Sequence, residues 1–294
     1  ESERAYMFWY NPYGGISTKN IWPEKETSVR TQNNTTDILN IVVDPRKVVG
    51  TRQPLPADSV WGGLMRSLPS SYRDQTESKF IRVRGCCSSG RIHIDLGLIS
   101  EDVNGDKVLN TEDEKRGGIR NGLLDEGEDV GLDGKGDNEE VAVYGGDTLR
   151  ASSPDSLFEK YDLQVGDPAG DNYQYSSAGD KRFQYRHING TQGNRQESGG
   201  QIPDTEDINR NNILDRQEHF FAYSFPLDTT DNPYYVTQTR YPDNDEFPAN
   251  VRGKYTGWKL YRIPLSDFDP ARTSPQASLE EIEFARMWFS DFEF

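Results

Sequence analysis

The chain has 294 residues, and 33 Lys and Arg stand against 49 Asp and Glu, so its net charge at pH 7 is −16. A chain this acidic is not expected to bind nucleic acid or an anionic membrane surface. Its longest unbroken apolar run, Ala5–Tyr10, is far shorter than the about 20 residues of a membrane helix, so no transmembrane helix is predicted. The 5 Trp, 15 Tyr and 13 Phe supply enough large side chains for one sizeable β-rich core or two small ones.

Alternating apolar and polar residues, with many β-branched and aromatic side chains, predict several short strands. In the clearest of them Ile92 and Ile94 share one face while His93 and Asp95 share the other, which predicts one buried and one solvated face. In chain order the predicted strands are Ala5–Tyr10, Asp37–Asp44, Lys79–Arg84, Arg91–Ile99, His219–Leu227, Tyr234–Tyr241, Gly257–Pro264 and Glu281–Phe289.

No long segment keeps a helical apolar period, so helices are expected only as single turns, around Pro154–Tyr161. Short strands with turn-rich connections predict an all-β fold, an antiparallel jelly-roll β-sandwich with one core. We expect residues 1–36 to be an N-terminal segment with one apolar strand, and residues 37–99 and 219–294 to be the two halves of the sandwich. Between the halves, residues 100–218 form a long loop insertion whose ends we expect to lie close together.

Two cysteines, Cys86 and Cys87, are adjacent in the sequence, which excludes a disulfide to a distant partner in the same chain. We interpret them as free or half-buried thiols, with a strained vicinal disulfide or a bond to another chain as the alternatives. Glu1 opens the chain without a charged and apolar leader, which indicates a processed secretory protein or a piece of a larger one.

The insertion is rich in Gly, Asp and Asn and nearly free of apolar clusters. Residues 101–140 hold 14 acidic and 5 basic side chains, a net charge of 5 − 14 = −9. Structureless loops longer than about 15 residues are uncommon in compact domains, so either bound cations order this segment or it is a solvated, disordered loop.

A pattern that occurs three times in the insertion favours bound cations. Each copy reads [DN]-x-[VIL]-L-[DN]-x-x-[DE], a spacing that random acidic sequence does not produce. The copies are Asp106–Asp113, Asn121–Glu128 and Asn211–Glu218.

Extended upstream, the first and third copies become twelve-residue loops of the EF-hand type. Such loops bind calcium through oxygens at positions 1, 3, 5, 7, 9 and 12, with a backbone carbonyl at position 7. Position 6 is normally Gly, and here Lys107 and Asn212 occupy it, which we expect to weaken binding without abolishing it. The predicted ligands are Asp102, Asn104, Asp106, the Val108 carbonyl, Asn110 and Asp113 in the first loop, and Asp207, Asn209, Asn211, the Ile213 carbonyl, Asp215 and Glu218 in the third.

Two weaker candidates lie between these loops. Asp129, Asp133, Asp137 and Glu140 fall on positions 1, 5, 9 and 12 of a further loop, but Gly131 at position 3 offers no side-chain ligand. The middle copy lacks ligands at positions 1 and 3, so its Asp125 and Glu128, with Asp129, are predicted to complete a site shared with a neighbouring loop. We expect two or more Ca2+ ions, because flexible, oxygen-rich loops suit calcium better than magnesium.

No motif with catalytic chemistry has its required neighbours, so we expect no enzyme activity. The segment Gly131–Gly136 lacks phosphate-loop spacing and is surrounded by acids. The three histidines, His93, His187 and His219, are scattered, and each is interpreted as a surface or packing residue. Trp61 and Trp258 could stack on sugar rings, although tryptophan in a β-sandwich is more often part of the core.

Seven short motifs follow one another along the chain: Trp61–Leu68, Ile94–Asp102, Glu128–Gly134, Gly166–Tyr173, Pro203–Asn212, Trp258–Leu265 and Ile282–Trp288. Their order resembles that of the SprA (Sov) family, giant outer-membrane proteins that act as the type IX secretion translocon and in gliding motility. The resemblance implies a surface-exposed jelly-roll module, similar to carbohydrate-binding modules, carried between strands of a very large barrel. This chain shows no succession of amphipathic membrane strands, so a channel function of this piece is not expected.

Together these features predict a non-catalytic, calcium-stabilised structural or interaction domain at the extracellular or outer-membrane surface of a diderm bacterium. Its expected partners are other protein chains of a surface assembly, with self-association and glycan binding left open. One alternative is a filament subunit that donates the apolar Ala5–Tyr10 strand to a neighbour, while the simpler interpretation of that segment is an edge strand within the chain. The other alternative is a carbohydrate-binding module.

Overall fold

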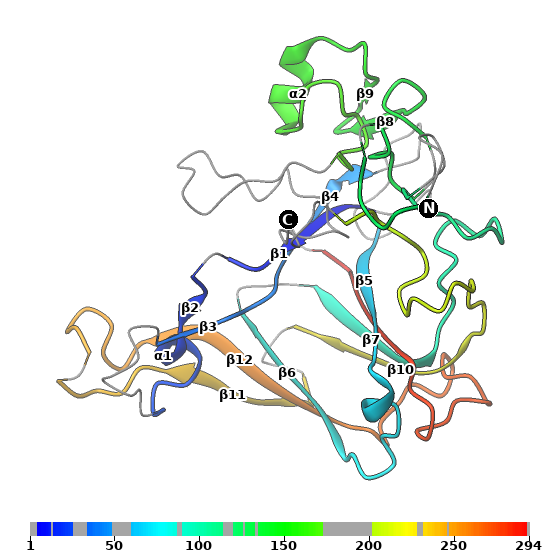
Figure 1. Cartoon of the computed structure of the whole chain (residues 1–294). Helices are drawn as coiled ribbons and strands as arrows, with labels where there is room; N and C mark the ends of the chain where they lie inside the picture. Colours follow the sequence, from blue (N-terminus) through cyan, green and yellow to red (C-terminus); the bar gives the residue numbers. More distant parts are fainter. Residues whose placement is uncertain are drawn as a thin grey trace.

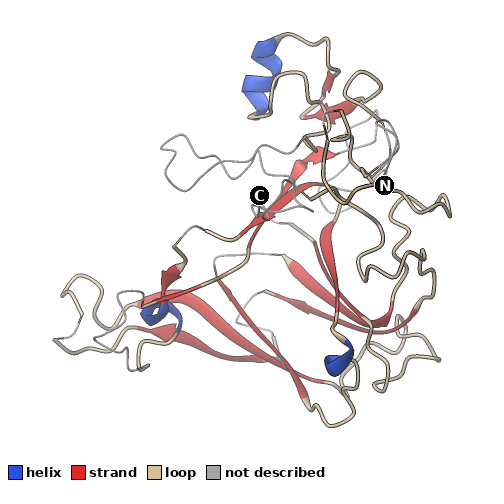
Figure 2. Cartoon of the chain, viewed as in Figure 1, coloured by secondary structure: helices blue, strands red, loops and turns tan. Residues whose placement is uncertain are grey.

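Strands dominate the computed structural model, and within the described residues they form four antiparallel sheets (Figures 1 and 2). The helical pieces are short: α1 (Thr18–Ile21), the single turn η2 (Ser70–Tyr72) and α2 (Asp155–Tyr161). The all-β prediction is confirmed, and α2 lies where a short helix is expected. The structure describes residues 5–12, 14–25, 34–48, 60–86, 90–113, 120–125, 127–132, 135–172, 202–227, 232–245 and 247–292.

Two of the sheets face each other across the main hydrophobic cluster. One has the strand order β10-β7-β13-β5 and the other the order β11-β12-β6. All of these strands except β5 overlap strands predicted from the alternation. Their bounds are β5 (Gly62–Ser67), β6 (Phe80–Cys86), β7 (Arg91–Leu98), β10 (His219–Pro226), β11 (Tyr235–Arg240), β12 (Tyr255–Pro264) and β13 (Phe284–Ser290).

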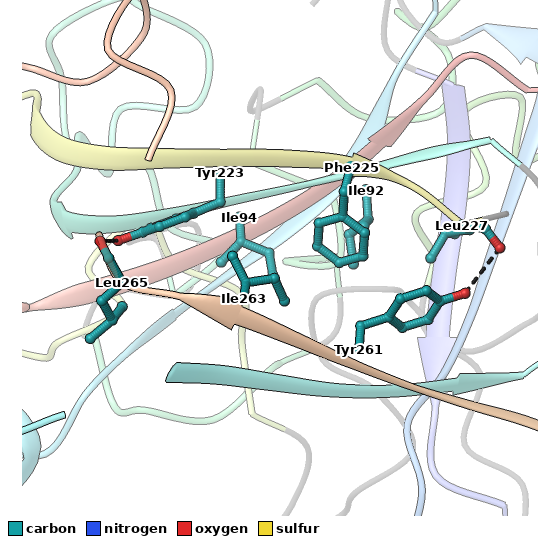
Figure 3. Close-up of a cluster of buried hydrophobic side chains, with 8 residues drawn as sticks. All are labelled: Ile92, Ile94, Tyr223, Phe225, Leu227, Tyr261, Ile263 and Leu265. Carbon is teal, nitrogen blue, oxygen red and sulfur yellow. Dashed lines mark hydrogen bonds between the residues drawn. The ribbon is translucent and has the colours of Figure 1, made fainter. Parts of the chain in front are cut away.

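The core between these sheets is built from both of them, and its side chains point toward one another from β7, β10 and β12 (Figure 3). Two buried tyrosines satisfy their hydroxyls on backbone carbonyls, Tyr223 on Leu265 and Tyr261 on Leu227, each at 3.0 Å. Such bonds let a large aromatic ring be buried without leaving its polar atom unpaired. The cluster comprises Ile92, Ile94, Tyr223, Phe225, Leu227, Tyr261, Ile263 and Leu265.

Strand β5 was not predicted, because its first residues, Gly62 and Gly63, weaken any strand signal. The structure shows why glycine is used at the second of these positions. β5 pairs with β13, and Gly63 lies opposite Trp288. A Cβ at Gly63 would collide with the Trp288 side chain, so the absence of a side chain makes room for the indole.

The ends of the insertion meet, as expected. Leu98 at the end of β7 pairs with His219 at the start of β10, and the ladder continues to Arg91 and Pro226. The two strands on either side of the insertion are therefore neighbours in one sheet. The insertion leaves the sheet at the end of β7 and returns at the adjacent start of β10.

The prediction of a single core is wrong, because a second cluster forms around the N-terminal strand. The sheet β1-β4-β8-β9 takes β8 and β9 from inside the insertion, and β4 lies here rather than in the sandwich as predicted for Asp37–Asp44. The apolar residues of the insertion are spread along the sequence and meet only when they fold against β1. The cluster comprises Tyr6, Ala142, Tyr144, Leu149, Phe158 and Leu163.

In Figure 1 this smaller sheet lies above the sandwich, and α2 lies beside β8 and β9 at the top of the view. β1 is its edge strand and pairs with β4 along its whole length, as the simpler interpretation of the apolar segment expects. A further short pair, β2 with β3, lies next to α1. The bounds are β1 (Ala5–Tyr10), β2 (Ile16–Ser17), β3 (Thr35–Thr36), β4 (Asn40–Val48), β8 (Ala142–Tyr144) and β9 (Asp147–Leu149).

The predicted solvated face of β7 is in fact covered. His93 is 7% exposed and Asp95 is fully buried. Asp95 accepts hydrogen bonds from Arg286 Nε at 2.9 Å and from Trp288 Nε1 at 3.0 Å, and Arg272 reaches it at 3.4 Å. The alternation within β7 is correct, but residues distant in sequence supply polar partners that let both faces be buried.

Cys86, the last residue of β6, is disulfide-bonded, which corrects the preferred interpretation as a free thiol; Cys87 lies outside the described residues. Within the part of the chain that the structure describes, no helix is long and apolar enough to cross a membrane.

Candidate metal centres

The first predicted loop, residues 102–113, folds around its own carboxylates. Asp102 accepts hydrogen bonds from the backbone N–H groups of Gly105 at 2.7 Å and Lys107 at 3.0 Å. Asp106 accepts from Val108 N–H at 2.7 Å. The side chains at positions 1 and 5 therefore already face the inside of a tight backbone turn, which is where the ligands of an EF-hand-type loop lie.

The third loop, residues 207–218, repeats this arrangement. Asp207 accepts from the N–H groups of Asn211 at 2.9 Å and Asn212 at 2.7 Å, and the Asn211 side chain accepts from Ile213 N–H at 2.7 Å. A side-chain bond from Asn211 to Asp215, at 3.1 Å, joins positions 5 and 9. Two segments about a hundred residues apart in the sequence thus fold alike, as their shared pattern predicts.

Position 6 has the left-handed backbone that makes glycine common there. Its φ is 69° at Lys107 and 62° at Asn212. Gly122 holds the same place in the middle copy and has a φ of 75°. The turn is therefore kept in all three copies, at a cost in backbone strain where the residue is not glycine.

The middle copy obtains its missing first carboxylate from Asp113. The two oxygens of Asp113 accept from the N–H groups of Asn121 and Gly122, each at 2.8 Å, just as Asp207 holds Asn211 and Asn212. The Asn121 side chain again donates to Asp125, at 2.9 Å. Asp113 was predicted as the last ligand of the first loop, and the structure instead turns it toward the middle copy.

The last residues of the other copies also have defined contacts. Glu218 accepts from Ser100 N–H at 3.3 Å and lies 3.9 Å from Arg286. Glu128 is buried and accepts from Asp125 N–H at 2.9 Å, which places both of these predicted ligands in one turn.

A fourth group of carboxylates has its oxygen atoms close enough together to bind one metal ion. Asp137, Glu140, Asp167 and Asp171 each offer one carboxylate oxygen, and these oxygens all lie within 4.8 Å of one another. Asp137 and Glu140 were predicted, whereas Asp167 and Asp171 were not. Of the other residues in that predicted loop, Asp129 is half-buried, and Asp133 lies outside the described residues.

Asp167 opens a turn of the same kind as the predicted loops. It accepts from Gly170 N–H at 2.6 Å and from Asn172 N–H at 3.3 Å, the same relative positions that Asp102 uses. Asp167 is 2% exposed, and its burial, together with the charge of Asp137, raises its pKa to about 6. The sequence signal was the segment Asp167–Asn172, which shares the Asp-x-x-Gly-Asp start of a loop but lacks the apolar pair that follows.

A glutamate immediately precedes the first aspartate of three turns, and this signal was missed in the sequence. Glu101, Glu112 and Glu206 are each at most 1% exposed. Their carboxylates accept backbone N–H groups from other segments: Glu101 from Ile208, Glu206 from Val103 and Glu112 from Asp204. In each Glu-Asp pair the aspartate therefore shapes its own turn while the glutamate joins that turn to another.

Burial raises the pKa of Glu101 to about 7 and also raises the pKa of Glu206. Backbone N–H donors oppose both shifts but do not cancel them. Among the described residues, neither carboxylate contacts a lysine or arginine. Buried carboxylates without a positive partner favour binding of an external cation.

Carboxylate, amide and carbonyl oxygens at these turns are the ligand atoms that calcium prefers.

The aromatic candidates lie in or next to strands of the sheets rather than at these turns. Trp61 is 36% exposed and contacts Trp288 edge-on, whereas Trp258 is half-buried. His93 stacks on Trp288 at 3.6 Å between ring centroids, so it is a packing residue as expected.

Comparison with known proteins finds a family that is similar to the C-terminal part of the chain. Residues 155–294, which run from α2 through the third loop to β13, match the family model SprA_N, described as motility related/secretion protein. No curated protein matches the chain.

Proposed function

Because the chain is a SprA-like member of a motility related/secretion family, we propose that it is a non-catalytic, calcium-stabilised structural or interaction domain of the bacterial cell surface. The observation that carries the proposal is the repeated turn of the insertion, in which a first aspartate holds the backbone N–H of position 6 in three separate segments. Nothing in a solvated loop requires the same carboxylate geometry three times, whereas a shared ligand does.

Calcium is the cation that fits best. The turns offer several oxygens from carboxylates, amides and carbonyls on exposed segments, and calcium accepts six to eight such ligands. Magnesium demands fewer ligands at shorter distance and holds on to its water. Bound calcium would also neutralise the carboxylates that carry most of the chain's excess negative charge.

The two facing sheets support a jelly-roll sandwich as the scaffold. Their strands come from both sides of the insertion, and the chain crosses between the sheets from β5 to β6, from β6 to β7, from β10 to β11 and from β12 to β13. In this arrangement the insertion projects from one edge of the sandwich, where ordered loops can present a surface to other chains of a surface assembly.

The proposed location is extracellular, at the outer-membrane surface of a diderm bacterium. Extracellular calcium-binding modules have dissociation constants of about 10⁻⁴ to 10⁻³ M, and such sites fill outside the cell but stay empty in the cytoplasm. The motility and secretion family agrees with a surface location.

The two alternatives receive no comparable support. β1, the strand proposed for donation to a neighbour, pairs with β4 of its own chain along its whole length. Of the aromatics that could stack on a sugar ring, Trp61 packs edge-on against Trp288, and His93 covers a face of the Trp288 ring.

The direct test is calcium content and thermal unfolding. The purified chain should bind at least two calcium ions in equilibrium dialysis against millimolar calcium. At a free calcium concentration a hundredfold above the dissociation constant, each site should add about 2.7 kcal/mol to the free energy of unfolding. EGTA should therefore lower the melting temperature.

Asp207→Ala should reproduce part of the effect of EGTA. Asp245→Ala is the matched control, because the Asp245 side chain is 99% exposed and pairs with Arg252 at the surface. An unchanged melting temperature in EGTA, together with no bound calcium, would reject the proposal.

A further inference from the structure

Two buried glutamates cross between the first and third loops. Glu101 directly precedes the first loop, yet its carboxylate accepts the backbone N–H groups of Ile208 at 2.8 Å, Asn209 at 3.2 Å and Asp215 at 3.2 Å, all in the third loop. Glu101 is fully buried, so these three donors replace the water that it has lost.

The exchange is reciprocal. Glu206 directly precedes the third loop, and its carboxylate accepts the N–H groups of Val103 at 2.8 Å and Asn110 at 2.9 Å, both in the first loop. Positions 2 and 9 of each loop are therefore held by the glutamate that precedes the other loop.

The backbone follows the same exchange. Glu101 N–H donates to the Asp215 carbonyl at 2.8 Å, and Glu206 N–H donates to the Asn110 carbonyl at 3.0 Å. Next to these contacts Thr111 and Thr205 form an antiparallel bridge. The two loops thus meet along a short paired segment, and on each side of it a glutamate carboxylate accepts backbone N–H groups of the opposite loop.

We propose that the first and third loops bind their cations as one cooperative unit, with Glu101 and Glu206 as positioning residues that link the occupancy of one loop to the order of the other. The inference rests on the proposed calcium function and adds a rule of regulation to it. Neither glutamate needs to contact a cation, because each acts through the backbone of the opposite loop.

The physical basis is shared ordering. An ion bound at Asp102 fixes the backbone next to Glu101, and a fixed Glu101 carboxylate holds the N–H groups of the third loop in place. The second ion then meets a loop whose conformational entropy is already lost, which is positive coupling between sites. Repulsion between two divalent ions opposes this coupling, and the two buried carboxylates between the loops reduce that repulsion.

The test is hydrogen-exchange mass spectrometry of the full chain at stepped calcium concentrations. Peptides covering residues 102–110 and 207–215 report the two loops separately. In the wild-type chain both peptides should become protected at the same calcium concentration. Asp207→Ala should shift protection of residues 102–110 to calcium concentrations about tenfold higher, within the usual 5- to 150-fold range of coupling between sites.

The positioning role has its own variants. Glu101→Gln and Glu206→Gln keep the size of the side chain, but each replaces an accepting oxygen with a donor that faces a backbone N–H. Each should separate the two protection curves. The exposed Glu280 provides the matched control, since Glu280→Gln changes the charge equally and should leave the curves coincident.

Each outcome decides between the two proposals. If calcium protects both peptides but Asp207→Ala leaves the curve of residues 102–110 unmoved, the loops are independent and the coupling is rejected. If Asp207→Ala does not fold, coincident curves in both Glu→Gln variants reject the coupling instead. If calcium protects neither peptide in the wild-type chain, the calcium function itself fails and the coupling fails with it.

Discussion

The sandwich and the insertion bury carboxylates in opposite ways. Asp95 in the sandwich is fully buried, and two arginines and a tryptophan surround it. Glu101 at the root of the insertion is also fully buried, but among the described residues it accepts only backbone N–H groups, and burial raises its pKa to about 7. Arg272 and Arg286 supply positive charge to Asp95, whereas no lysine or arginine among the described residues contacts Glu101.

The difference indicates where an external cation would act. When a buried anion is paired with cations of its own chain, folding alone neutralises its charge and satisfies its hydrogen bonds. Asp95 in the sandwich therefore needs no external ligand. An anion that meets only dipoles still carries part of its desolvation cost, and a nearby divalent cation would remove that cost. The insertion should therefore respond to calcium and the sandwich should not.

The largest expected effect comes from breaking the charge pairing of the sandwich. Asp95→Asn removes the charge that Arg272 and Arg286 share and should lower the free energy of unfolding by about 3 kcal/mol. Chemical denaturation measures it. The loss should be nearly the same in calcium and in EGTA, because Asp95, Arg272 and Arg286 lie outside the insertion and Arg286 approaches its Glu218 only to 3.9 Å.

The matched control is Asp245→Asn, which removes the same charge from a carboxylate on the surface. It should leave the denaturation midpoint unchanged, because exposed ion pairs contribute little. A loss for Asp95→Asn that appears only in calcium would contradict the separation of the two regions.

The next effect sharpens the insertion side of the comparison. Asp113→Asn removes the carboxylate that holds the N–H groups of Asn121 and Gly122. Amide exchange at these residues should rise about tenfold, since one or two charge-assisted hydrogen bonds weaken. The denaturation midpoint of the sandwich should not move.

Glu139→Gln is the control for Asp113→Asn, because Glu139 is an exposed acid of the same insertion. Its exchange pattern should match that of the wild-type chain. Equal exchange in both variants would mean that Asp113 does not hold the middle copy.

A smaller effect tests the sandwich cluster by pH. Burial, and after it the charges of Arg272 and Arg91, lowers the pKa of His93 from 6.5 to about 4. Because the folded pKa lies below the unfolded one, the stabilising contribution of neutral His93 is present above pH 6.5 and is lost as pH falls toward 4.

Between pH 7 and pH 5.5 the wild-type chain in EGTA should lose about 1 kcal/mol of stability through this residue. His93→Gln puts an uncharged polar amide in place of the imidazole and has no titrating group, so its stability should fall less over this interval. Parallel profiles for the two chains would show that His93 does not titrate as its burial requires.

The sandwich strands could be predicted because their signal is local. Alternating residues such as Ile92 and Ile94 mark the buried face of β7 without reference to any other strand. The fate of the other face depended on Arg272, Arg286 and Trp288, which are distant in sequence and approach Asp95 only in the folded chain. No periodicity can show such partners.

The insertion divides in the same way. The positions within a loop follow from spacing: the pattern puts Asp102 and Asp207 at position 1, and each accepts the N–H of position 6 of its own turn. The use of Asp113 by the middle copy, and the grouping of Asp167 with Asp137, depend on how separate turns pack. The second core escaped prediction for the same reason, since Tyr6 meets the apolar residues of the insertion only after folding.

The smallest effect concerns the strain that the insertion retains. Lys107 has a φ of 69° at position 6, where a side chain is disfavoured, so Lys107→Gly should stabilise the first loop by about 0.5 to 1 kcal/mol and tighten its calcium binding. Asn212→Gly should gain less, because asparagine tolerates this backbone better than lysine. The half-saturation concentrations from hydrogen exchange of residues 102–110 and 207–215 measure both changes.

Lys254→Gly is the control, because Lys254 is an exposed lysine whose backbone φ is not positive. This substitution should only destabilise the fold, because glycine makes the unfolded chain more flexible. If Lys107→Gly instead weakens calcium binding and lowers stability as Lys254→Gly does, the backbone at position 6 is not strained. The turn that Asp102 holds would then not be the calcium-binding conformation of the first loop.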